Sequence, residues 1–176
     1  MIRAGAVRAL PWLAACGIAL AALALPALAV PALALPAHAA GFQPCNPTDP
    51  NQVRLVISVS GMRSAAGSVA ITIYPNDAGH FLDGKYKVAR QALPVALPVT
   101  HACFAVAAPG YYAVALFHDR DNSGSFRTTA LGLPAEGYGF SNNPKLVFGP
   151  PGLASVRFRA HRGDNPIVVR MQHFGR

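Results

Sequence analysis

Hydrophobic and polar residues alternate along much of the chain after residue 52. Val53, Leu55, Ile57 and Val59 form one side of the first such segment. A period of two residues is typical of a half-buried β-strand, and it recurs around residues 69–73, 102–106, 154–159 and 167–172. Residues 111–118 are apolar on both sides, which predicts a central strand covered on both faces. The segment Gly61–Gly67 predicts a turn that joins the first two strands into a hairpin.

No segment beyond residue 39 has a convincing helical period of 3.6 residues. Six or seven short strands in about 120 residues predict an all-β fold, an antiparallel β-sandwich of immunoglobulin-like or transthyretin-like type. Residues 53–176 would form this single domain. The Pro- and Asn-rich residues 40–52 predict an extended N-terminal arm, and residues 119–152, rich in Gly, Asn and Pro, predict long loops at one end of the sandwich.

Residues 1–39 have the pattern of an export signal. Arg3 and Arg8 provide a positive start, an Ala- and Leu-rich segment follows, and the sequence Ala-His-Ala at residues 37–39 matches a signal-peptidase site. We therefore expect cleavage near Ala39 and a periplasmic or secreted protein, with no transmembrane segment after cleavage.

Two alternatives for this leader stay open. It is long enough to be a retained membrane anchor, although Pro26, Pro31 and Pro36 would break a spanning helix. The sequence Leu-Ala-Ala-Cys that ends at Cys16 also matches a lipoprotein acylation site.

The mature chain would keep two cysteines, Cys45 and Cys103. An even number of cysteines in an oxidising compartment favours one disulfide between them. Because the bond would close a long loop, the chain-entropy model gives a stabilisation of about 4 kcal/mol. Two free thiols are the alternative, and no Cys-x-x-Cys pair supports redox catalysis or a structural zinc site.

Removal of the leader changes the meaning of the composition. The whole chain is 52% hydrophobic with a net charge of +8, but the leader holds much of the hydrophobic excess, and loss of Arg3 and Arg8 lowers the charge to +6. Four arginines at predicted outward strand positions would form a basic stripe if their strands were neighbours: Arg54, Arg157, Arg159 and Arg170. For an exported protein, an anionic envelope surface such as lipid headgroups is the expected partner rather than nucleic acid. A solvated basic face without a partner is the alternative.

The first part of the long loop region has the spacing of a calcium loop. Oxygen-bearing side chains at Asp119, Asp121, Ser123 and Ser125 occupy relative positions 1, 3, 5 and 7, and a glycine occupies position 6. The bidentate Glu expected at position 12 is missing, and Glu136 would supply a carboxylate only if the chain folds back. The alternative is a hairpin turn in which the Asp and Asn side chains bond their own backbone. No cofactor is therefore expected, with calcium as the one to test.

The second part of the loop region alternates aromatic and acidic residues with glycines. Gly137 and Gly139 would permit positive φ and let the rings fold over the end of the sandwich. One hypothesis is a shallow pocket for a sugar or peptide, lined by residues of the loop region: His118, Asp119, Glu136, Tyr138, Ser141, Asn142 and Asn143. The alternative is a plug, in which rings fill the core and asparagines satisfy backbone groups.

The same region holds the residue types of a hydrolase. Ser141 as nucleophile and His118 as base would be two members of a Ser-His-acid triad, which occurs in any chain order. However, the segment around Ser141 lacks the second Gly of a nucleophile elbow, and no strand–helix pattern would support one. We therefore assign no catalytic residue and expect a protein that is not an enzyme.

The long loop and the strand before it match the motif of a known family. The matching residues are Gly110–Val114, His118-Asp119, Gly124, Gly132-Leu133-Pro134 and Glu136–Asn143, and the run GLPxEGYGFSNN is the most specific part. Over residues 53–173 the chain resembles the bacterial family called domain of unknown function 2141. The resemblance implies a small exported β-sandwich and implies no activity. Members commonly carry HDxNxNGxxD, and Arg127 stands where the second carboxylate of that pattern belongs.

These observations together predict an exported, non-enzymatic β-sandwich of the cell envelope that binds a ligand or protein partner through residues 118–144. A calcium-stabilised envelope or adhesion module and a hydrolase using Ser141 and His118 are the two alternatives.

Overall fold

The computed structural model describes residues 45–146 and 149–175. The export signal at residues 1–39, the acylation site at Cys16 and residues 40–44 of the arm lie outside the described residues and stay predictions. In the described part of the chain, no helix is long and apolar enough to cross a membrane.

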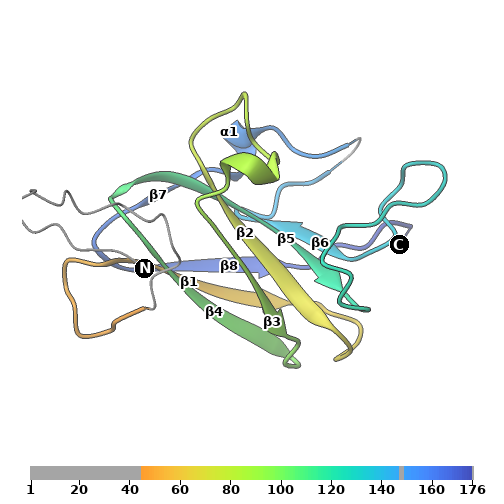
Figure 1. Ribbon diagram of the computed structural model, residues 1–176, viewed down its shortest axis with the longest axis horizontal. Helices are drawn as coiled ribbons and strands as arrows, with labels where there is room; N and C mark the ends of the chain where they lie inside the picture. The colour runs from red at the N-terminus through yellow and green to blue at the C-terminus, as the bar shows by residue number, and fades with distance from the viewer. Residues whose placement is uncertain (1–44, 147–148, 176) are drawn as a thin grey trace, which may run out of the picture. The chain divides into compact units, whose positions relative to one another are not determined.

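Two sheets make up the domain (Figure 1). One sheet has the strand order β4-β1-β8, and the other has the order β3-β2-β5-β6, with β7 paired to β5. The elements in chain order are β1 (Val53–Ser60), β2 (Ser68–Pro75), the 3-10 turn η1 (Gly84–Tyr86), β3 (Ala89–Pro94), β4 (Val99–Val106), β5 (Gly110–Asp119), β6 (Tyr138–Phe140), α1 (Leu153–Val156), β7 (Phe158–Ala160) and β8 (Gly163–Arg170).

The core lies between the two sheets and uses the alternating side chains. Leu55, Ile57 and Val59 of β1 pack in one cluster with Val69, Ile71 and Ile73 of β2, and all six are fully buried. Each such side chain contributes roughly 1.5–3 kcal/mol when it leaves water. The all-β sandwich predicted from the alternation is therefore confirmed.

The predicted hairpin of the first two strands is wrong. β1 pairs antiparallel with β4 and parallel with β8, whereas β2 pairs with β3 and β5 in the other sheet. A tight hairpin uses two to five connecting residues, and the seven of Gly61–Gly67 allow the chain to cross from one sheet to the other. One sheet is consequently mixed rather than purely antiparallel.

The strand predicted around 154–159 is also only partly correct. Residues Leu153–Val156 form the single helical turn α1, and only Phe158–Ala160 form a strand, β7. Leu153 and Val156 lie three residues apart, which places both on one face of the turn, and both are buried beside Phe140. An alternating pattern this short does not distinguish a strand from a helical turn.

The described end of the arm is tethered rather than extended. Residues 45–52 form turns, and a disulfide joins Cys45 to Cys103 on β4, with 6.0 Å between their Cα atoms. The Arg54 guanidinium donates hydrogen bonds to the carbonyls of Asn46 and Asp49 at 2.9 and 2.6 Å. The predicted disulfide is thus present, and it fixes the start of the domain to the β4 edge.

Candidate functional site

Asp119 is the last residue of β5, and its carboxylate hydrogen-bonds to the backbone of the loop that follows. Asp119 is 2% exposed; its Oδ1 accepts a hydrogen bond from the backbone N–H of Ser123 at 2.9 Å, and its Oδ2 accepts one from Gly124 at 2.7 Å. Burial raises the pKa of Asp119, but the hydrogen bonds from Gly124 and Ser123 outweigh it, and the pKa is lowered overall. The Asp119 carboxylate therefore hydrogen-bonds to the backbone of its own loop. This is the hairpin turn described above as the alternative to a calcium loop.

Arg127 lies among the acidic side chains of the same loop. Carboxylate oxygens of Asp119, Asp121 and Glu136 lie within 4.8 Å of one another. Arg127 Nη1 is 2.9 Å from Asp121 Oδ2, and Arg127 Nε is 3.2 Å from Glu136 Oε1. The backbone N–H of Arg127 also donates to Glu136 Oε2 at 3.2 Å. A guanidinium therefore supplies positive charge to the acidic cluster.

Of the other two predicted calcium ligands, Ser123 and Ser125, the hydroxyl of Ser123 has partners of its own. The Ser123 hydroxyl contacts the carboxylate of Asp119 and the backbone carbonyl of Ser125, both at 3.2 Å. The structure thus brings Asp119 and Asp121 together with Glu136, which the sequence linked to them only if the chain folded back. It also shows that Arg127 contacts Asp121 and Glu136. The one sign of this in the sequence was that Arg127 replaces the second carboxylate of the family pattern.

His118 and Ser141 are both buried and both bond to the backbone. The Nε2–H of His118, which is 2% exposed, donates to the carbonyl of Ala66 at 2.8 Å. The Ser141 hydroxyl, fully buried, donates to the carbonyl of Val156 at 2.5 Å and accepts from the N–H of Val114 at 2.9 Å. These bonds join β5 to α1 and to the β1–β2 connection, and they provide no nucleophile–base pair.

Asn142 and Asn143 have positive φ values of 64° and 46°, a conformation that Asn tolerates better than most residues. The Asn142 amide donates to the carbonyl of Arg157 at 2.9 Å. The Asn143 amide donates to the carbonyl of Val168 at 2.8 Å and accepts from the N–H of Arg170 at 2.7 Å. Asn143 therefore occupies backbone groups of β8 as a neighbouring strand would.

The two glycines beside Tyr138 are needed for close packing. Neither Gly137 nor Gly139 has positive φ, so the expected role in turning the chain is wrong. A Cβ on Gly139 would lie 2.7 Å from Cγ1 of Val169, and one on Gly137 would lie 2.7 Å from Cε1 of His173. Because β6 passes so close to β8 and the segment after it, no side chain fits between them.

Tyr138 and Phe140 differ in their surroundings. Phe140 is 7% exposed and packs with Tyr74, Ala113 and Val156, as in the plug hypothesis. Tyr138 is half-buried, and its backbone pairs with Gln172 through two hydrogen bonds of 2.9 and 2.7 Å. Its ring meets Phe126 edge to face, with 6.3 Å between centroids. Tyr138 is thus held rigidly while part of its ring stays accessible.

Tyr138 lines a hollow of about 430 Å³ at the surface. Its other lining residues include Arg63, Leu146, Gln172, His173 and Phe174. Apart from Tyr138, none of these was singled out from the sequence, because they come from three separate segments with no shared motif. In this hollow, Tyr138 contributes an aromatic ring, and Tyr138 is one of the ligand-binding residues predicted from the sequence.

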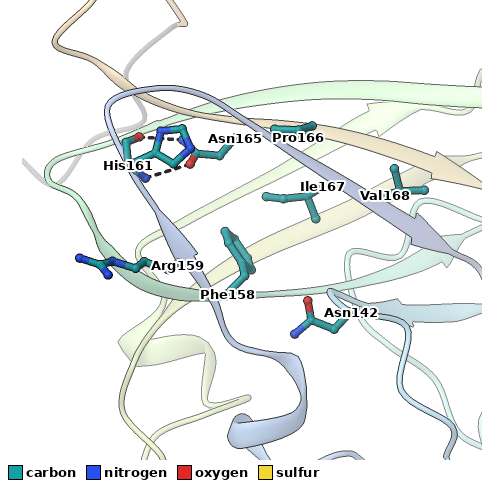
Figure 2. A pocket seen from close by; sticks show the side chains of 8 residues that line it. All are labelled: Asn142, Phe158, Arg159, His161, Asn165, Pro166, Ile167 and Val168. Carbon is teal, nitrogen blue, oxygen red and sulfur yellow. Dashed lines mark hydrogen bonds between the residues drawn. The ribbon is translucent and has the colours of Figure 1, made fainter.

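A second hollow of about 270 Å³ lies where β7 and β8 meet, and Figure 2 shows the residues around it. Its buried polar group, the Asn165 amide, accepts from the N–H of His161 and donates to its carbonyl, both at 2.8 Å. Asn142 in its lining donates to the carbonyl of Arg157, between α1 and β7, and Arg159 extends away from Phe158 and Ile167 (Figure 2). The two side-chain amides of this hollow, Asn142 and Asn165, therefore hydrogen-bond to backbone groups.

Comparison with known proteins places the β-sandwich residues in one family. A family model described as "Uncharacterized protein conserved in bacteria (DUF2141)" matches residues 57–168. The chain belongs to the DUF2141 family. No curated protein and no solved structure matches it. The DUF2141 match includes Arg63 and Tyr138 but ends before Gln172 and His173, so the larger hollow combines family-matched and unmatched residues.

The four arginines of the predicted basic stripe are dispersed in this DUF2141 protein. Arg54 lies on the outer face of β1, opposite Val53 and Leu55, but it is only 8% exposed and pairs with Asp164, so it adds no exposed charge to a stripe. The Arg157 guanidinium lies 5.3 Å from the centre of the Tyr111 ring, between α1 and β7. Arg159 lies in the sheet of β5, and Arg170 ends β8 in the other sheet. Their strands are not all neighbours, which was the condition for a single stripe.

Proposed function

We propose that this DUF2141 chain is an exported, non-enzymatic β-sandwich module of the cell envelope that binds a small ligand at the hollow beside Tyr138. The leader pattern and the Cys45–Cys103 disulfide support export, since disulfides persist in oxidising compartments. The polar residues of 118–144 serve as the scaffold for this binding surface.

One contrast carries the proposal. His118, Asp119, Ser141 and Asn143, which have the chemistry of a catalytic or polar site, are each bound to backbone groups. Tyr138, from the same segment, instead presents a half-buried ring to a hollow whose size suits a small ligand. A rigid aromatic side chain with an apolar face and a polar tip is a common anchor in binding sites.

Expression of the full chain in a bacterial host tests both parts of the proposal. Mass spectrometry of the purified periplasmic protein should give a chain that begins at Ala40. A thermal-shift panel of neutral sugars, sugar acids, amino acids and dipeptides should then include compounds that raise Tm of the wild type but not of Tyr138→Ala.

Tyr86→Ala is the matched control, because Tyr86 is an exposed tyrosine on η1 that stacks on His80. Ligands that stabilise Tyr138→Ala as well as the wild type would refute the placement of the site. Ester or peptide hydrolysis that disappears in Ser141→Ala would refute the non-enzymatic assignment.

A further inference from the structure

The hollow beside Tyr138 is preformed by three segments that hydrogen-bond to one another. The N–H of Met171 donates to the carbonyl of Ser60 at 2.8 Å, and the Nε2–H of His173 donates to the carbonyl of Gly61 at 3.1 Å. Gln172 and Tyr138 pair through their backbones. The C-terminal segment is thereby fixed between β6 and the turn after β1, so a ligand would meet walls that are already in place.

The charge of the hollow is one-sided. Arg63 lines it, and no Asp or Glu side chain of the described residues does. All seven Asp and Glu side chains have partners elsewhere: Asp49 with Asn51, Asp77 with His80, Asp83 with Lys85, Asp119 with Ser123 and Gly124, Asp121 and Glu136 with Arg127, and Asp164 with Arg54. Within residues 45–146 and 149–175, the exposed Arg63 guanidinium has no hydrogen bond or ion pair.

The remaining polar groups of the hollow suit hydroxyls. The Tyr138 hydroxyl has no hydrogen-bond partner among the described residues. His173 uses Nε2 as a donor, which leaves Nδ1 as an acceptor. Gln172 uses its Nε2 to donate to the carbonyl of Pro144 at 3.1 Å, which leaves its side-chain oxygen as a second acceptor. One cation, an aromatic ring and these acceptors line one cavity.

We infer that the hollow takes a small anionic sugar, a sugar acid or sugar phosphate, whose anion pairs with Arg63 and whose ring stacks on Tyr138. Guanidinium binds carboxylate and phosphate through charge-assisted, often bidentate hydrogen bonds. The cavity of about 430 Å³ lies within the range of small-molecule sites. This inference rests on the proposed function, because it names the ligand class of the same site.

Isothermal titration of the purified protein with glucuronate, glucose 6-phosphate and glucose tests the inference. Both anions should bind about fivefold more tightly than glucose, since an exposed charge-assisted pair accounts for up to about that factor. Preference for glucuronate would identify a carboxylate ligand, and preference for glucose 6-phosphate a phosphate ligand. Higher salt should weaken both anions and not glucose.

Variants separate the two contributions. Arg63→Gln should lower the affinity for both anions to that for glucose without changing Tm, whereas Tyr138→Ala should weaken all three sugars. Arg162→Gln is the control, because Arg162 is an exposed arginine in the connection between β7 and β8, away from the hollow.

Two results would overturn the inference. If glucose binds as tightly as the anions and Arg63→Gln has no effect, the ligand class is wrong, while dependence on Tyr138 would leave the proposed function intact. If none of the three sugars binds, the inference fails, and the thermal-shift panel decides the proposed function independently.

Discussion

Replacement of Arg127 by alanine should destabilise the domain, although Arg127 lies at the surface. Glu136 is 5% exposed, whereas the Arg127 side chain is 49% exposed. Removing one partner of a fully buried ion pair costs about 3–5 kcal/mol, and removing one from an exposed pair costs about 0–1 kcal/mol. The pair of Arg127 and Glu136 lies between these limits, and the backbone N–H of residue 127 would still bond Glu136. We therefore expect a loss of about 1–3 kcal/mol in the free energy of unfolding.

Urea unfolding of Arg127→Ala, Glu136→Gln and the double variant measures this coupling. The double variant should be more stable than the sum of the single losses implies, by about 1 kcal/mol, because the two side chains interact directly. Arg120→Ala is the matched control, since Arg120 is exposed in the same loop. If Arg127→Ala costs no more than Arg120→Ala, the argument that the guanidinium of Arg127 stabilises the acidic cluster is refuted.

Four further predictions follow from the same structure. Calcium at millimolar concentration, or its removal by a chelator, should leave Tm unchanged, because the Arg127 guanidinium already pairs with Asp121 and Glu136; a clear rise in Tm would restore the calcium hypothesis. Stability should fall as the pH drops below about 3.8, because the pKa of Asp119 is lower in the folded state than this ordinary value; acid titration of Asp119→Asn should show a shallower loss. Reduction of Cys45–Cys103 should cost about 4 kcal/mol in the free energy of unfolding, and Cys45→Ser should reproduce that loss in urea without reductant. Gly139→Ala should cost about 1–3 kcal/mol by overpacking against Val169, whereas Gly149→Ala, a control with no heavy atom within 4 Å of its Cβ, should show only the smaller strain of its positive φ.

The sequence predicts where the strands lie along the chain better than it predicts which strands pair. A period of two residues marks which side of a segment faces the core, and β1 and β8 follow it, whereas β2 is buried on both faces. It contains no information on which strand lies beside which. The parallel pairing of β1 with β8 depends on contacts between residues more than 100 positions apart, such as Arg54 with Asp164. The burial of Arg54 on the outer face of β1 is for that reason not visible in the sequence.

Within the candidate segment, the structure divides the roles of the side chains differently from the sequence analysis. The side chains of Ser141 and Asn143 look like ligand-binding groups in the sequence, yet their partners are backbone atoms of α1 and β8, which no local pattern reveals. The glycines beside Tyr138 indicated a special backbone, whereas the structure needs them because a neighbouring strand passes close by. Arg63 and His173 join Tyr138 only through the tertiary fold.

Backbone amide NMR of the protein during titration with glucuronate tests the central claim most directly. The account predicts that the largest chemical-shift changes occur at Arg63, Tyr138 and His173, with small changes at Asp119 and Ser141. Changes concentrated at His118, Asp119 and Ser141, with none at Tyr138, would contradict it.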